Sequence, residues 1–119
     1  MQSGESTREK GMEVTENWLL NYPDLKAIFG TNDMMGLGAV QAIDAAGADV
    51  IVVGFDATGE ACEVIKSDGA MKASIAQQPK LLGQVGMETI LNIIAGNEVE
   101  PLVEAAVVTV SAENVDEYM

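Results

Sequence analysis

Apolar positions along the chain follow helical spacing in some segments and form strand-like runs in others. Apolar residues three and four positions apart predict helices, which cover residues 7–21, 33–46, 79–95 and a short segment capped by Thr58. Short uncharged runs predict strands at residues 25–29, 50–54, 71–76 and 105–110, and residues 113–119 add a final helical turn or two. Because single helices separate successive strands, the pattern predicts an α/β fold with a parallel, doubly wound, flavodoxin-like sheet.

Local signals predict where the first two long helices begin and end. Ser6 and Glu9 fit a capping box, in which each side chain accepts a hydrogen bond from the other residue's free amide. Asn32 or Thr31 can cap the second helix. Gly47 then ends that helix, because glycine adopts the left-handed conformation without steric cost.

Two segments are apolar on more than one side. The strand at residues 50–54 carries no charge, so we expect it to be covered on both faces. The helix at 79–95 is apolar around most of its circumference, and its narrow polar strip holds Gln84, Glu88 and Asn92. A helix on one face of a sheet needs a single apolar stripe, so we expect this helix to have a second buried contact with another lobe or another chain.

Composition and charge exclude several classes of function. The 119 residues include 19 acidic and 6 basic side chains, and the net charge of −13 argues against nucleic acid and anionic membranes as partners. The chain has no His and a single cysteine, Cys62, which excludes the usual zinc sites and the nucleophiles that depend on His. We expect no metal, no cofactor and no enzyme activity, and the polar residues 1–10 do not form a secretory signal.

Polar side chains follow the carboxyl ends of three predicted strands, where open parallel sheets bind their ligands. Asn32 follows the first strand, Asp56 the second and Gln77 the third. Amides donate and accept hydrogen bonds and carboxylates accept them, a mixture that suits the hydroxyl groups of a neutral sugar or polyol. The alternative is that these residues are helix caps and turn residues, which Asn and Asp supply routinely.

Two further patterns carry weaker signals. Gly36-x-Gly38 lacks the third glycine of a dinucleotide-binding loop, so close helix packing explains it better. Asp33 and Asp56 are candidates for a pair of carboxylates in general acid–base chemistry, but no base, nucleophile or metal set accompanies them.

Three motifs resemble the sugar-binding proteins of bacterial ABC importers, and most of all the ribose-binding group of these type I periplasmic binding proteins. The motifs lie at residues 28–39 (IFGTNDMMGLGA), 52–56 (VVGFD) and 73–79 (ASIAQQP), in the order and at the spacing of that family. The ending at residues 107–119 is also similar to the family's C-terminus, whereas residues 2–7 match it poorly.

The resemblance implies that the chain is a single partial domain, the C-terminal part of a protein with two lobes. Residues 1–77 would belong to the C-terminal lobe, and residues 107–119 would be its last strand and tail. Residues 78–106 would cross the hinge and pack on the N-terminal lobe, which would explain the apolar helix. Without that lobe, two copies exchanging the helix at 79–95 could form a homodimer.

The resemblance also implies a function and its residues. Asn32 and Gln77 would contact sugar hydroxyls, and Asp56 would accept hydrogen bonds from a pair of them. The parent protein would bind a pentose or hexose in the periplasm and deliver it to the membrane subunits of the ABC transporter. The fragment alone would bind weakly or not at all, because it lacks the opposing wall of the sugar site.

Two other classes share parts of this pattern. The effector-binding half of a LacI-type transcription repressor has the same two lobes, but repressors usually carry a proline loop before the Gly-Phe-Asp strand, where this chain has Gly47, Ala48 and Asp49. A receiver domain of two-component signalling fits the length and Asp56, but it needs an acidic pair after a first strand, and residues 1–10 offer neither.

Overall fold

The computed structural model describes all of residues 1–119 and divides them into two compact units. The first unit contains Met1–Ala76 and Thr109–Met119, and the second contains Gln77–Val108. The elements are α1 (Arg8–Asn21), β1 (Ala27–Phe29), α2 (Asp33–Ala46), β2 (Ile51–Phe55), α3 (Gly59–Lys66), β3 (Met71–Ala76), α4 (Pro79–Ile94), β4 (Val108–Ser111) and the short 3₁₀ helix η1 (Val115–Glu117).

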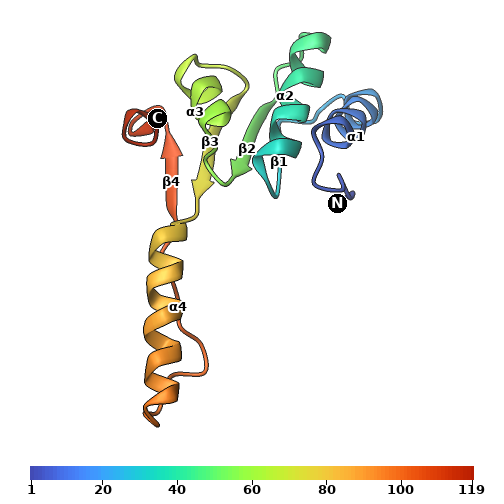
Figure 1. Cartoon of the computed structure of the whole chain (residues 1–119). Coiled ribbons are helices and arrows are strands. Elements are labelled where there is room, and N and C mark those ends of the chain that lie inside the picture. Colours follow the sequence, from blue (N-terminus) through green and yellow to red (C-terminus); the bar gives the residue numbers. More distant parts are fainter. The chain divides into compact units, whose positions relative to one another are not determined.

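The sheet has four strands in the order β1-β2-β3-β4. β1 pairs with β2 and β2 pairs with β3, both in parallel, with Phe29 beside Val53 and Phe55 beside Ile75. β4 runs in the opposite direction to β3 (Figure 1). The predicted α/β class and the parallel sheet are therefore confirmed, with one edge strand antiparallel.

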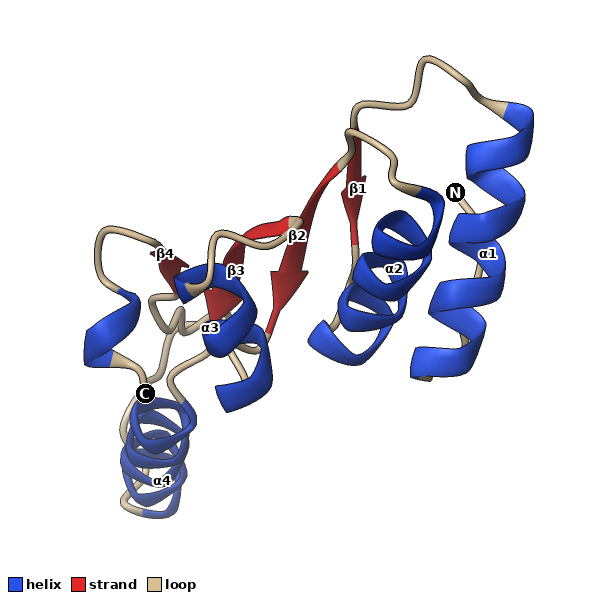
Figure 2. Cartoon of the chain, turned by 90° about the horizontal axis from the view of Figure 1, so that it is seen from above, coloured by secondary structure: helices blue, strands red, loops and turns tan.

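Helices cover one face of the sheet. Figure 2 shows α2 and α3 on the same side of the strands. Ile28, Val52 and Met71 are buried. The side chains of Val52 and Met71 point to α2, because they lie within 3.6 Å and 2.8 Å of a Cβ atom placed on Gly36. The alternate residues Phe29 and Ile51 are 57% and 41% exposed. The prediction that the strand at residues 50–54 is covered on both faces is thus wrong for this chain, because successive strand residues point to opposite faces and only one face meets a helix.

α1 lies directly against α2, and glycines allow the close approach. A Cβ atom placed on Gly38 would clash with the carbonyl oxygen of Arg8 and approach Met12 N to 2.8 Å. Gly36 allows α2 to lie close to the sheet, because a Cβ atom there would come within 2.8 Å of Met71 Cε in β3. The interpretation of Gly36-x-Gly38 as a packing motif is confirmed.

The helix signals hold at α2 and fail at the start of α1. Asn32 caps α2 and Gly47 ends it with a φ of 60°, as predicted. The capping box of Ser6 and Glu9 is wrong: the cap of α1 is Thr7, whose hydroxyl accepts from Lys10 N at 3.2 Å. Ser6 has a left-handed φ of 57°, so its backbone cannot adopt the extended conformation that a cap residue needs.

The second unit contains α4 and the chain that returns from it. Pro79 begins α4 and Gly96, with a φ of 78°, follows its end. No residue of α4 is buried, although the helix carries exposed leucine, isoleucine and methionine side chains. No helix of the structure combines the length and the apolar character that crossing a membrane requires. The interpretation of residues 78–106 as a segment that packs on another lobe stays a prediction.

The last strand begins later than its apolar pattern predicts. β4 covers Val108–Ser111, whereas the prediction was 105–110. A strand needs a hydrogen-bonded neighbour, and β3 ends at Ala76. An apolar run by itself does not indicate where its neighbour ends.

Candidate functional site

Two predicted site residues lie at the carboxyl ends of adjacent parallel strands. Asn32 follows β1, and Asp56 follows β2 directly. Backbone hydrogen bonds continue the pairing of neighbouring strands beyond their ends. Gly30 N donates to Val53 O at 2.8 Å, and Asp56 N donates to Ile75 O at 2.9 Å. The sheet therefore places Asn32 and Asp56 at the same edge.

Asn32 is half-buried and acts as a helix cap. Its Oδ1 atom accepts a hydrogen bond from Met35 N at 2.9 Å. The cap interpretation of this residue is thus confirmed, but a cap uses only the side-chain oxygen. The amide nitrogen carries two hydrogens, which can donate to a ligand hydroxyl while the cap stays in place.

Asp56 is exposed, and its backbone adopts an uncommon conformation. Its φ is 118°, and that of Ala57 is 52°, so two consecutive non-glycine residues have positive φ. Such conformations cost energy and persist where the surrounding structure fixes them. The surrounding structure therefore fixes the backbone of the loop that carries Asp56.

A buried carboxylate lies beneath this loop. Asp33, the first residue of α2, has no exposed surface. Its Oδ1 accepts from Ser74 Oγ at 2.6 Å. Its Oδ2 accepts from Thr58 N at 2.7 Å and from Thr58 Oγ1 at 3.0 Å. Both oxygens of Asp33 thus bind internal donors, so the weak hypothesis of Asp33 and Asp56 as an acid–base pair gains no support.

The Asp33 carboxylate also acts electrostatically on the nearby thiol of Cys62. Cys62 on α3 is fully buried, and its Sγ lies 3.7 Å from the carbonyl oxygen of Ala57. Burial, and to a lesser degree the Asp33 carboxylate, raises the pKa of the Cys62 thiol above its ordinary value. The thiol therefore stays protonated near neutral pH, where it acts as a packing group and not as a nucleophile.

Sequence reasoning missed the role of Ser74. This residue is fully buried in β3, between apolar neighbours that face the same side. A hydroxyl at a buried strand position needs a hydrogen-bond partner, and this requirement is the sequence signal that could have indicated a role for Ser74. Its partner, Asp33, lies 41 residues earlier in the sequence, so the pattern of β3 could not identify it.

Gln77 is the first residue of the second unit and follows Ala76, the last residue of β3. The sequence prediction that it follows the third strand is therefore confirmed in its local form. Its predicted contact with a ligand stays a prediction.

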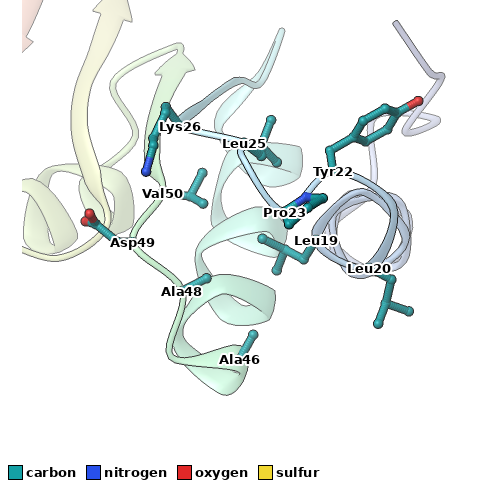
Figure 3. A pocket seen from close by; sticks show the side chains of 10 residues that line it. All are labelled: Leu19, Leu20, Tyr22, Pro23, Leu25, Lys26, Ala46, Ala48, Asp49 and Val50. Atoms are coloured by element: carbon teal, nitrogen blue, oxygen red, sulfur yellow. The ribbon is translucent and has the colours of Figure 1, made fainter.

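A hollow in the structure lies away from these residues. Its volume is about 380 Å³, and it opens where α1 and α2 end and where the chain enters β1 and β2 (Figure 3). The lining is mostly apolar and includes Leu19, Pro23, Leu25 and Val50. This is the amino end of the strands, opposite to Asn32 and Asp56, and it brings together none of the predicted site residues.

Residues 1–98 match the family profile described as periplasmic binding protein domain. The chain belongs to this family. The match covers the first unit up to the end of β3 and continues through α4. The resemblance inferred from the three motifs is thereby confirmed.

Curated relatives of this periplasmic binding protein chain include sugar-binding proteins. The ribose import binding protein RbsB of Haemophilus influenzae is 46% identical over 99 residues, which cover 83% of this chain and 34% of the relative. RbsB of Bacillus subtilis is 41% identical over 104 residues, covering 87% and 34%. The D-allose-binding periplasmic protein of Escherichia coli is 36% identical over 100 residues, covering 82% and 32%. The chain thus spans about a third of the length of these relatives.

Solved structures of the same family share the fold. A periplasmic solute-binding protein of an ABC transporter from Actinobacillus succinogenes, with bound D-allose, superposes with a TM-score of 0.86 at 34% identity. That match covers 98% of this chain and 42% of the other. An ABC transporter solute-binding protein from Bacillus halodurans with bound myo-inositol gives 0.78 at 35% identity, covering 94% and 39%. These relatives bind solutes, and their names describe no enzyme activity.

Proposed function

We propose that this chain supplies part of the sugar site of a solute-binding protein that serves an ABC importer. One observation carries the proposal: in a family whose curated relatives bind ribose and allose, Asn32 and Asp56 follow adjacent parallel strands at the same edge of the sheet. The relatives reported above are transport proteins, and no observation favours the repressor alternative.

The chemistry of the candidate contacts suits a neutral sugar. The Asn32 amide nitrogen donates to a hydroxyl oxygen, and the exposed Asp56 carboxylate accepts from hydroxyl hydrogens. Gln77, which follows the third strand, would do both. No lysine or arginine occurs at residues 30–34, 54–58 or 76–78, so these strand ends offer nothing to neutralise an anionic ligand.

The proposed activity is binding without chemical conversion. In the whole protein, contacts from two lobes would favour a closed state that the membrane subunits of the importer recognise, in the periplasm. This chain, which matches about a third of the relatives' length, would keep only its own contacts. Millimolar affinity corresponds to about −4.1 kcal/mol, and we expect this chain to bind no more tightly than that.

Calorimetric titration of the 119-residue chain with D-ribose, D-allose and myo-inositol tests the proposal. We expect one of the three to bind in the millimolar range, and Asp56→Ala to abolish the binding. Asn32→Asp is the sharper variant, because it keeps the oxygen that caps α2 and removes both amide hydrogens. Asp44→Ala, an exposed acidic residue of the same helix, is the matched control and should leave the affinity unchanged. Equal affinity of the wild-type chain and the Asp56 variant would contradict the proposed site.

We also propose that a second copy of the chain covers α4 in solution. The helix has no buried residue, and its large apolar side chains are roughly half exposed, including Met87, Ile90 and Leu91. The exposed apolar residues continue in the returning segment at Leu102 and Val103. Exposed apolar side chains that gather on one helix favour association between chains. A mass that stays monomeric over a hundredfold range of concentration would contradict this.

A further inference from the structure

Three successive backbone amides in the loop after β2 each have a fixed acceptor. Asp56 N donates to Ile75 O at 2.9 Å, and Ala57 N donates to Ser74 Oγ at 2.9 Å. Thr58 N donates to Asp33 Oδ2 at 2.7 Å. The acceptors therefore come from β3 and from the start of α2, elements that are far from the loop in sequence.

We propose that Asp33 is a positioning residue, which fixes the loop Asp56–Thr58 and thereby the direction of the Asp56 carboxylate. Asp33 acts on two of the three amides. It accepts directly from Thr58 N, and it accepts from the hydroxyl of Ser74, whose oxygen then lies ready to accept from Ala57 N. This inference rests on the proposed function, because that function makes Asp56 a ligand contact.

The hydroxyl of Ser74 has one hydrogen, so its direction depends on Asp33. The 2.6 Å bond to Asp33 Oδ1 uses that hydrogen and leaves the lone pairs of Oγ for Ala57 N. Hydrogen bonds to a charged acceptor are also shorter and stronger than neutral ones. The carboxylate thus orients the serine, and the serine in turn orients the loop.

The backbone conformation of the loop needs such support. Asp56 and Ala57 have φ values of 118° and 52°, in the region that favours glycine. A loop of two non-glycine residues would relax to negative φ unless its amides were held. The hydrogen bonds that the three backbone amides donate, and the hydrogen bond from the Thr58 hydroxyl to Asp33, supply that restraint.

The structure makes room for Asp33 through a motif glycine. A Cβ atom on Gly54 would clash with Asp33 Oδ1. Gly54 is the glycine of the Gly-Phe-Asp sequence at residues 54–56, and Asp33 belongs to the Asn-Asp pair at residues 32–33. The two motifs are therefore in direct contact. The Asp33 carboxylate occupies the space that the missing side chain of Gly54 leaves free.

Amide hydrogen exchange measured by NMR on the ¹⁵N-labelled chain tests the proposal. In Ser74→Ala, which removes the acceptor of Ala57 N, we expect the exchange of Ala57 to accelerate by about threefold to tenfold relative to Ile43, the range for a lost neutral hydrogen bond. In Asp33→Asn, which removes the charged acceptor of Thr58 N, we expect the exchange of Thr58 to accelerate by about tenfold to a hundredfold relative to Ile43. The amide shift of Asp56 should change as well. Asp44→Asn, which removes an exposed charge from the same helix, should change none of these values.

The ratio to Ile43 separates positioning from a general loss of stability. If exchange at Ala57 and Thr58 accelerates only by the same factor as at Ile43, which is fully buried in α2, the proposal is overturned. The wild-type chain gives a second test that does not depend on the folding of a variant. Exchange at Ala57 and Thr58 that is as fast as in an unstructured peptide would also overturn it.

Sugar titration distinguishes this proposal from the proposed function. A loop that loosens in the variants, in a chain that binds no sugar, supports positioning by Asp33 and counts against the sugar site. If the chain binds sugar but amide exchange at Ala57 and Thr58 does not change in the Asp33 and Ser74 variants, the result supports the sugar site and overturns the positioning role.

Discussion

The two units of this chain have similar apolar side chains and use them differently. In the first unit Ile43, Val52 and Met71 are essentially fully buried between α2 and the sheet. In the second unit Ile94 is 76% exposed, and no residue of α4 is buried. The difference teaches that apolar content alone does not make a core, because burial requires a second surface within reach.

The first unit is itself covered on one side only. Its sheet buries the side chains that face the helices, whereas Phe29 and Ile51, at alternate strand positions, are exposed. The curated relatives extend well beyond the third of their length that this chain matches, so they would have chain available for both the open sheet face and α4. The four predictions below test how far the contrast between the units holds, beginning with the largest expected effect.

The largest contrast is expected between two isoleucines. Ile43→Ala should lower the free energy of unfolding by about 2–5 kcal/mol, because it removes buried methyl groups and leaves a cavity. Ile94→Ala should change it by less than about 0.5 kcal/mol, since its side chain contacts mainly solvent. Urea unfolding at low protein concentration measures both. Similar losses from the two variants would show that α4 belongs to the same cooperative core.

The second prediction concerns self-association. Ile90→Glu combined with Ile94→Glu should weaken the dimer by at least about tenfold, because burying one isoleucine contributes about 1.5–3 kcal/mol. Sedimentation equilibrium measures the dissociation constant. Glu88→Gln, on the polar strip of the same helix, is the control and should leave the constant close to that of the wild type. A dimer that tolerates both glutamates must use another surface, such as the open sheet face.

The third prediction compares two glycines. Gly54→Ala should destabilise the first unit by about 1–3 kcal/mol, because its methyl group would overlap Asp33 Oδ1. Gly83→Ala meets nothing within 4 Å and should instead stabilise α4 by about 0.5–1 kcal/mol, since alanine has the higher helix propensity. Thermal unfolding reports the first change, and the far-ultraviolet helix signal reports the second. Tolerance of Gly54→Ala would mean that Asp33 can move.

The smallest effect is expected at the surface ion pair of α1 and α3. Arg8 donates to both carboxylate oxygens of Glu60, at 2.8 and 2.6 Å. This hydrogen bonding lowers the pKa of Glu60 below its ordinary value. Because the folded pKa is the lower one, the contribution is present at neutral pH and is lost as the pH falls through the lowered pKa.

Glu60→Gln should therefore cost less than about 1 kcal/mol at neutral pH, because both side chains are partly exposed and solvent screens them. The difference from the wild type should shrink in high salt and at acid pH. A loss that is independent of salt would indicate a packing role for Glu60 instead.

The local elements of this fold could be predicted because their signals are local. Helix α2 and strand β3 have the predicted bounds, 33–46 and 71–76, since caps, turn residues and apolar spacing act over a few residues. The start of α1 could not be decided in the same way. Ser6 and Thr7 are both good caps, and the backbone conformation that chooses between them depends on the turn before the helix.

In the candidate site, too, some features follow from the sequence and others only from the tertiary structure. The sequence by itself determined that Asn32, Asp56 and Gln77 follow successive strands, because order along the chain and strand direction fix which end of a parallel sheet they reach. Only the tertiary structure decided that Asp33 lies beneath the Asp56 loop, bonded to Ser74 and Thr58. Those partners are 41 and 25 residues away in sequence, and a hydrogen bond between them exists only once the strands have paired.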